Sequence, residues 1–262
     1  MKRILCLLAV AVGLSSCGVV SQLDAGRLLQ GGVYAAQALT LTDAQVENYV
    51  HQYIQQLDAQ SQVLPESSPY TKRLRKIIDS FDGVNELPLN FKVYKEDQVN
   101  AFACADGSVR VYSGIMDVMT DEELAGVLGH EMGHVALHHT RKQMQKQMLT
   151  SATLQGIAST SQTAAQLTDS QLGAIGEAVL NAKFSRNMET EADDYGYNFL
   201  CEAGKNPWTM VMAFEKLQAL SGNSQGGPVS NIFSSHPDTA TRIEHITQRC
   251  INDGYNRPAQ KK

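Results

Sequence analysis

The sequence predicts an α+β fold that is mainly helical and carries one small antiparallel sheet. Two capping boxes, Thr42 with Gln45 and Thr120 with Glu123, mark the starts of helices. Residues 89–113 instead alternate apolar and polar side chains, which is typical of strands. No repeat is visible along the chain, so these elements should form one medium-sized domain.

Composition supports a globular core and excludes one class of partner. The chain has 262 residues, of which 43% are hydrophobic and 19% are charged. These proportions are typical of a protein with a packed interior. The formal net charge is only -5, and lysine and arginine form no dense cluster. We therefore expect no nucleic-acid partner.

Residues 1–16 are typical of a secretory signal peptide. Lys2 and Arg3 precede an apolar run, residues 4–14, which is shorter than the about 20 residues that span a bilayer. The run ends in the letters LSSC, the pattern of a bacterial lipobox, in which Cys17 is acylated and becomes the new N-terminus. The alternative is a plain signal peptide with a chance cysteine.

A lipid on Cys17 would attach the mature chain to a membrane, with residues 17–40 as a polar tether. Gly18 follows the cysteine, and similarity to bacterial lipoproteins indicates that a residue other than Asp there favours the outer membrane. No later stretch is apolar enough to span a bilayer. We expect a lipid-anchored protein of the bacterial outer membrane, with its domain facing the periplasm.

The folded domain is expected at residues 41–255, followed by a tail at 256–262. Pro69 after Ser68 predicts a helix start, and Asp106-Gly107 predicts a hairpin turn within the sheet. Residues 150–170 are rich in small and polar side chains, and the sequence leaves open whether they form a helical hairpin or a lid. The expected helices cover residues 42–60, 68–81, 120–148, 170–202, 206–220 and 237–249.

Secretion changes what the cysteines can do. Cys6 leaves with the signal peptide and Cys17 carries the lipid, so Cys104, Cys201 and Cys250 remain in an oxidising compartment. Three cysteines cannot all pair within one chain, and connectivity does not follow from sequence. We expect a Cys201–Cys250 disulfide that ties the C-terminal segment to the domain, and a buried, unpaired Cys104.

The strongest chemical signal is the HExxH motif formed by His130, Glu131 and His134. Histidines four residues apart share one helix face, where both rings reach one zinc ion. Glu131 then lies beside the metal, where it can accept a proton from the attacking water and pass it to the leaving amine. Chance produces this motif in roughly one chain of this length in a hundred, and the alternative is a structural pair of surface histidines.

A catalytic zinc needs a third protein ligand and one open position. Glu189 and Asp193 share a helix face, so Glu189 suits the metal and Asp193 suits the free N–H of a metal-bound histidine. Glu191 points about 200° away from Glu189, and spacing alone leaves open which of the two binds. Without the HExxH motif, such an acidic helix would more often be a solvated face. His138 and His139 are expected to be solvated or to lie behind the ligands.

Taken together, the motifs resemble those of the zinc metallopeptidases related to HtpX and the CAAX prenyl proteases. The letters HEMGH are followed by SRNMETEAD, NAFA and VRVYSG precede them, and SHP with RI closes the series, in the family's order over about residues 40–250. This resemblance implies a gluzincin-like zinc peptidase fold and makes Glu189 the third ligand. Cys104 departs from the usual strand, which leaves its local redox chemistry open.

The resemblance also gives roles to residues outside the helix pair. An extended peptide could add to the edge strand that contains Asn100, Ala101 and Phe102, with Asn100 donating to the developing oxyanion. The alternative makes Asn100 a turn residue and Phe102 part of the core. His236 would donate to the tetrahedral intermediate with help from Arg242, or would bind zinc as a fourth ligand and switch the enzyme off.

We therefore expect a metalloendopeptidase with one zinc ion per chain, acting on misfolded envelope proteins in the periplasm. Its other partners would be proteins of envelope quality control, and this setting is implied by the resemblance alone. One alternative is a zinc-bound chaperone or scaffold that seldom cleaves. Another is a metal hydrolase that acts on a non-peptide bond, such as a cell-wall linkage.

Overall fold

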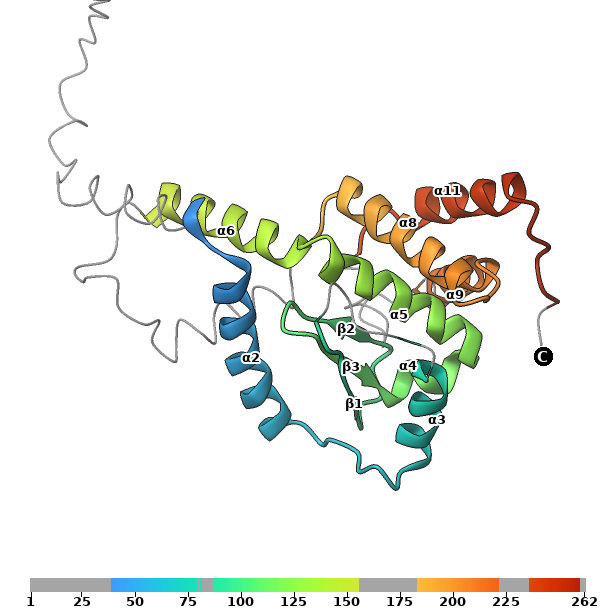
Figure 1. Ribbon diagram of the computed structural model, residues 1–262, viewed down its shortest axis with the longest axis horizontal. Coiled ribbons are helices and arrows are strands. Elements are labelled where there is room, and N and C mark those ends of the chain that lie inside the picture. The colour runs from blue at the N-terminus through green and yellow to red at the C-terminus, as the bar shows by residue number, and fades with distance from the viewer. Residues whose placement is uncertain (1–38, 80, 82–86, 156–182, 222–235, 260–262) are drawn as a thin grey trace, which may run out of the picture.

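A computed structural model describes residues 39–79, 81, 87–155, 183–221 and 236–259 (Figure 1). The expected signal peptide, Cys17, nearly all of the tether and residues 156–170 lie outside the described residues. Within the described part of the chain, no helix is long and apolar enough to cross a membrane.

The expected mainly helical α+β fold is confirmed. The elements follow one another as α2 (Asp43–Gln60), α3 (Pro69–Ile78), β1 (Asn90–Tyr94), β2 (Ala101–Ala103), β3 (Ser108–Tyr112), α4 (Ser113–Val118), α5 (Asp121–Ala136), α6 (His139–Gln155), α8 (Arg186–Glu202), α9 (Trp208–Ser221) and α11 (Thr239–Asn252). Both expected capping boxes are present, at the starts of α2 and α5.

The three-stranded sheet is mixed rather than wholly antiparallel, with the order β1-β3-β2. β2 and β3 form the expected hairpin, whose turn contains Gly107 at a φ of 80°. β1 instead pairs with β3 in parallel. After β1 the chain passes the start of α4, where Ser113 Oγ donates to the Glu96 carbonyl at 2.8 Å, before it returns as β2 on the far side of β3. β2 therefore forms the edge nearest α5.

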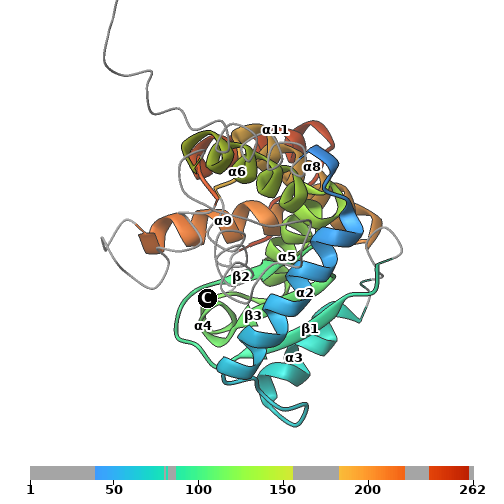
Figure 2. The same cartoon turned by 90° about the vertical axis from the view of Figure 1, so that its left-hand side faces the viewer.

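α5 is the central helix of the molecule. It packs against β2 on one side and against α8 and α9 on the other (Figures 1 and 2). Every residue from Glu123 to Ala136 is buried, which explains why α5 shows little amphipathic pattern. A helix that is buried all round fixes the direction of every side chain it carries.

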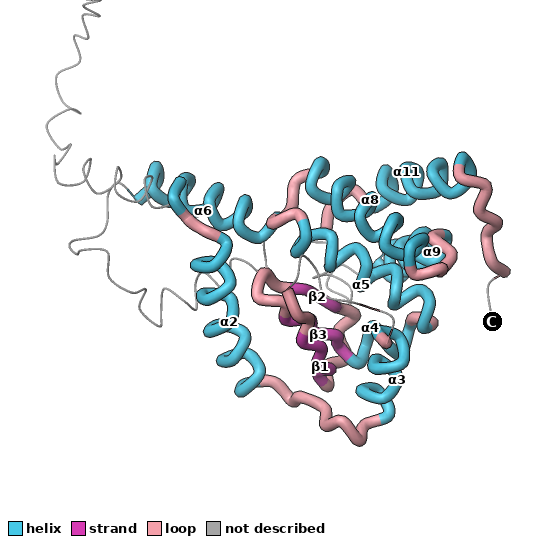
Figure 3. Tube along the Cα trace, viewed as in Figure 1, coloured by secondary structure: helices cyan, strands magenta, loops and turns pink. Residues whose placement is uncertain are grey.

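The helix is interrupted between α5 and α6, where a continuous helix to about residue 148 was expected (Figure 3). Leu137 and His138 close α5 with backbone bonds to Gly133 and Val135, and His138 has a φ of 54°. The segment contains no proline or glycine that would signal a stop, so the pattern could not reveal it. The break turns α6 towards α2 and gives His139 a new direction.

α8 also begins later than expected. Ser185 is its N-cap and accepts a hydrogen bond from the backbone N–H of Met188 at 3.3 Å. Residues 183–185 are not helical, and residues 170–182 lie outside the described residues. Because Ser185 fixes where the helix begins, it also fixes the position of Glu189, which lies four residues later in the first turn.

α2 is attached to the sheet by a partly buried ion pair. Arg110 of β3 is 2% exposed and donates from Nε and Nη2 to Asp58 of α2 at 2.8 and 3.0 Å. Lys92 donates to the same carboxylate at 2.7 Å. Burial raises the pKa of Asp58, but Arg110, Lys92 and Tyr94 outweigh it and hold that pKa at about 2. The carboxylate is therefore charged at neutral pH.

Cys104 is buried beneath α2 as expected, and burial raises the pKa of its thiol. Cys201 and Cys250 are neighbours in the core between α8 and α11, where both are free thiols. Their pairing stays a prediction.

Candidate metal centre

α5 places both motif histidines and Glu131 in one buried cluster. His130 and His134 are 2% and 1% exposed, and their Nε2 atoms lie 3.1 Å apart. Glu131 is 4% exposed. Burial lowers the pKa of His134 well below its usual range, with help from the neighbouring histidines. Two buried histidine ring nitrogens that face each other at this distance are arranged as metal ligands would be.

α8 supplies the third donor, and it is Glu189. Its carboxylate oxygens lie 3.5 Å from His134 Nε2 and 3.6 Å from His130 Nε2, and the residue is 0% exposed. Glu191 points away and pairs with His139. The structure thus brings Glu189, and not Glu191, next to the two histidines.

Small residues let α8 approach α5 closely enough for this contact. A Cβ atom on Gly133 would lie 2.8 Å from the Ala192 carbonyl oxygen, and one on Gly196 would lie 2.8 Å from the His130 backbone nitrogen. Both distances are shorter than side chains tolerate. The glycine inside HEMGH therefore has a packing role that brings the carboxylates of α8 to the histidines.

Four side chains place donor atoms close enough together to hold one metal ion. His236 Nδ1 lies 3.2 Å from His130 Nε2 and 3.2 Å from Glu189 Oε1, so it takes the fourth corner. Ligand bonds of 2.0–2.2 Å give tetrahedral edges of about 3.3–3.6 Å, close to the distances found here. Among the described residues, His130, His134, Glu189 and His236 form the cluster able to hold a metal ion.

Charge supports the same conclusion. Glu131, Glu189 and Asp193 are buried carboxylates, and Arg242 is the buried cation that faces them. Three carboxyl groups thus face a single guanidinium, so acidic groups outnumber the basic one. Buried charge is costly unless it is paired, and a divalent cation would neutralise the excess. The residues present therefore fit a divalent metal.

Asp193 and Arg242 contact the candidate metal ligands directly. Asp193 Oδ1 lies 2.8 Å from His130 Nδ1, as a carboxylate that orients a metal-binding histidine should. Arg242 also pairs with Glu189, at 2.7 Å. Burial raises the pKa of Asp193, but Arg242 and His130 outweigh it and hold that pKa at about 2. Both predicted supporting residues thus lie in direct contact with predicted ligands.

His236 reaches the cluster from the segment before α11. Its Nε2 lies 3.5 Å from Glu131 Oε1, while its Nδ1 faces Glu189. Burial lowers the pKa of His236, but the carboxylates of Glu131 and Glu189 outweigh it and raise that pKa. The side chain is in reach of both roles considered for it, fourth ligand and hydrogen-bond donor.

Three further aromatic or histidine side chains lie at the site. Sequence reasoning missed the two phenylalanines and left open whether His139 is solvated or lies behind the ligands. The ring of Phe184 stacks on His134, with centroids 3.9 Å apart, and Phe214 lies 4.4 Å from the guanidinium of Arg242. The third is His139, which is 0% exposed. Phe184 directly precedes the SRNMETEAD stretch, which was the one available signal.

The proposed substrate strand lies beside the cluster rather than in it. Ala101 is buried, the Asn100 carbonyl accepts from Tyr112 N–H at 3.0 Å, and Phe102 packs in the cluster beneath α2. None of the three belongs to the metal-ligand group. Their backbone nevertheless forms the sheet edge next to α5.

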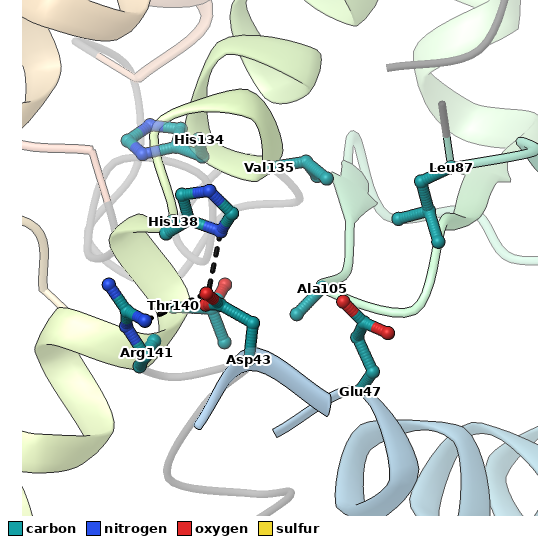
Figure 4. Close-up of a pocket in the computed structure, with 9 residues that line it drawn as sticks. All are labelled: Asp43, Glu47, Leu87, Ala105, His134, Val135, His138, Thr140 and Arg141. Atoms are coloured by element: carbon teal, nitrogen blue, oxygen red, sulfur yellow. Dashed lines mark hydrogen bonds and ion pairs between the residues drawn. The ribbon is translucent and has the colours of Figure 1, made fainter. Parts of the chain in front are cut away.

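Two pockets flank the cluster. The first, of about 440 Å³, touches His134 and is drawn in Figure 4, where His138 and Arg141 both reach Asp43 of α2. The second, of about 310 Å³, is lined by His130, Glu131, His236, Arg242, Val127, Phe214, Leu217 and Thr239. Histidines of the cluster thus line both pockets.

A buried HExxH helix with a glutamate from a second helix defines a metallopeptidase. The chain belongs to Peptidase family M48, whose model matches residues 70–250. It is 42% identical to Metalloprotease LoiP of Escherichia coli, over 97% of this chain and 98% of that one. It is 41% identical to Metalloprotease YcaL of the same organism, over 95% and 98%. The Beta-barrel assembly-enhancing protease of Escherichia coli is 26% identical over 75% and 42%. The family expected from the motifs is confirmed.

Proposed function

We propose that this metallopeptidase is a zinc endopeptidase that hydrolyses internal bonds of envelope proteins in the periplasm. The observation that carries the proposal is the position of Glu131, buried in one cluster with three histidine nitrogens and one carboxylate that could hold a metal ion. Zinc favours such a small, four-coordinate nitrogen and oxygen site. His130, His134 and Glu189 would hold one ion per chain.

Bound zinc would act as a Lewis acid that polarises the scissile carbonyl and makes the attacking water more acidic. Glu131 accepts the proton of that water and delivers it to the leaving amine. His236 and Arg242 donate hydrogen bonds where negative charge develops on the carbonyl oxygen. Asp193 keeps the His130 ring oriented throughout.

An extended substrate would pair with the edge of β2. The backbone of Asn100, Ala101 and Phe102 offers hydrogen bonds along this edge, and α5 runs next to it. A substrate side chain beyond the cluster would enter the pocket beside His134. Main-chain pairing tolerates many sequences, which suits a protease that clears misfolded proteins.

The proposed location is the periplasmic side of the outer membrane, with the lipid on Cys17 and residues 17–40 as tether. Support comes from the signal and lipobox pattern, and from a relative named as a beta-barrel assembly-enhancing protease. Other envelope quality-control proteins are the expected partners. Labelling with a radioactive fatty acid should mark the wild type and leave Cys17→Ser unlabelled.

The function is tested by zinc content and casein cleavage of the full chain in detergent, for wild type and Glu131→Gln together. We expect about one zinc per chain in both proteins and cleavage by the wild type alone, with a rate loss of roughly 10²–10⁴ in the variant. A variant that cleaves normally would remove Glu131 from the mechanism. A wild type without zinc would overturn the metal assignment.

A second candidate is a latched chaperone or scaffold, because His236 Nδ1 occupies the fourth corner of the donor set. A fourth protein ligand would take the position that a substrate carbonyl or water needs. His236→Ala distinguishes the two roles. The latch predicts faster casein cleavage, whereas loss of a catalytic donor predicts slower cleavage with zinc retained.

A further inference from the structure

A relay of side chains leads from the metal ligand His134 away from the cluster. His134 Nε2 faces His130 and Glu189, so its free ring nitrogen is Nδ1. That atom lies 2.9 Å from Nδ1 of His139. The other nitrogen of His139, Nε2, lies 3.0 Å from Oε2 of Glu191.

The distances fix where the protons sit once His134 binds a metal through Nε2. The ring proton of His134 is then on Nδ1, which must donate. A hydrogen bond between two Nδ1 atoms requires that one of them carries no proton. Because His134 Nδ1 is the donor, His139 Nδ1 is the unprotonated acceptor. The ring proton of His139 is then on Nε2. This N–H donates a hydrogen bond to the carboxylate of Glu191, which can only accept.

We propose that His139 is a positioning residue for the metal ligand His134, and that Glu191 sets the tautomer that makes His139 an acceptor. The two motif histidines are then oriented by different groups, His130 by the carboxylate of Asp193 and His134 by a neutral imidazole. This inference rests on the proposed role of His134 as a zinc ligand.

The break after α5 is what makes the contact possible. In a continuous helix, His139 would point about 140° away from His134. Instead His139 begins α6 with its ring turned back and 0% exposed. Its neighbour His138 turns outward to Asp43, with a side chain that is 45% exposed. His138 therefore provides a control position for substitutions of His139, because it is the adjacent histidine and pairs with Asp43 instead of His134.

The test is the zinc affinity of the full chain in detergent, measured by competition with a chromogenic chelator. His139→Asn keeps an acceptor at the position of Nδ1, and His139→Phe keeps the ring volume without one. We expect Phe to weaken zinc binding about 10–100-fold and Asn to stay within about threefold of wild type. His138→Asn, which tolerates the positive φ at that position, should bind zinc like wild type.

The opposite pattern would overturn the proposal. If Phe binds zinc like wild type, or Asn is as weak as Phe, His139 only fills space. Thermal unfolding of the metal-free variants shows whether each one is folded. A wild type that binds no zinc would overturn the inference together with the proposed function, whereas normal zinc binding by every variant would overturn the inference alone.

The tautomer has a signature of its own. In the zinc-loaded wild type, ¹⁵N chemical shifts of His139 should show a protonated Nε2 and a bare Nδ1. Glu191→Ala removes the acceptor and should shift His139 towards a mixture of tautomers, with zinc affinity lower than wild type. A proton on Nδ1 of His139 in the wild type would contradict the relay.

Discussion

Arg242 and Asp193 form a two-bond ion pair in the interior, with Nε–Oδ2 and Nη2–Oδ1 distances of 2.8 and 2.6 Å. The two side chains are 5% and 0% exposed. The same carboxylate faces His130, and the same guanidinium faces Glu189. One ion pair therefore holds a ligand from each of the two helices α5 and α8.

Arg242→Ala should destabilise the protein strongly, because it leaves two buried carboxylates without their cation. Breaking a buried pair in this way costs about 3–5 kcal/mol. Urea unfolding of the metal-free protein measures the change. Arg75→Ala is the control, because Arg75 and Glu66 form an exposed surface pair whose loss should change stability little. Equal losses in the two variants would contradict the prediction.

Glu189→Gln should weaken zinc binding by at least about 100-fold, because it replaces an anionic ligand by a neutral amide. Glu202 lies at the far end of the same helix and serves as the control, so Glu202→Gln should bind zinc normally. Chelator competition gives both affinities. Normal affinity in Glu189→Gln would remove this residue from the ligand set.

Gly133→Ala should separate α5 from α8, since the new Cβ would lie 2.8 Å from the Ala192 carbonyl oxygen. Such overpacking costs about 1–3 kcal/mol. Gly129→Ala is the matched variant, because its nearest contact would be 3.4 Å and alanine favours a helix by up to about 1 kcal/mol. Urea midpoints and zinc affinity should fall for Gly133→Ala alone. Similar behaviour of both variants would contradict the close-packing argument.

The parts of the site that sequence reasoning predicted are those fixed by local spacing or by a family motif. His130, Glu131 and His134 follow from helix geometry alone, whereas Glu189 needed the motif to separate it from Glu191. For His139 the sequence left open a solvated position and one behind the ligands, because the choice depends on a helix break that no proline or glycine announces. A helix pattern read as continuous places that ring on the wrong face.

In the fold, too, local sequence signals predicted some elements, whereas pairing between distant segments was not predicted. The helix starts at Thr42 and Thr120 follow from capping side chains within three residues, and the β2–β3 hairpin follows from Asp106-Gly107. The parallel pairing of β1 with β3 depends instead on contacts between distant segments, such as Ser113 with Glu96. Such long-range contacts leave no periodic trace in the sequence.

Protein purified under oxidising conditions should contain the Cys201–Cys250 disulfide, because Cys201 is half-buried and packs against the core cluster that contains Cys250. Such a cross-link contributes about 2–4 kcal/mol. Alkylation of denatured, unreduced mature protein should then modify one thiol, that of Cys104. Modification of three thiols would show that no bond forms. Cys250→Ser should raise the count to two.

The ion pair between Asp58 and Arg110 should make the attachment of α2 sensitive to acid. The pKa of Asp58 in the folded protein is about 2, against about 3.9 for an unperturbed Asp. A carboxyl group whose pKa is lowered by folding adds stability above its unfolded pKa, and this contribution is lost as the pH falls towards the folded value. Asp58→Asn should therefore unfold at a lower urea concentration than wild type at pH 7, and the gap should narrow between about pH 4 and pH 2. Because all other carboxylates are common to the two proteins, the difference between their urea midpoints isolates Asp58. A gap that stays constant over this range would show that the ion pair does not hold α2 on the sheet.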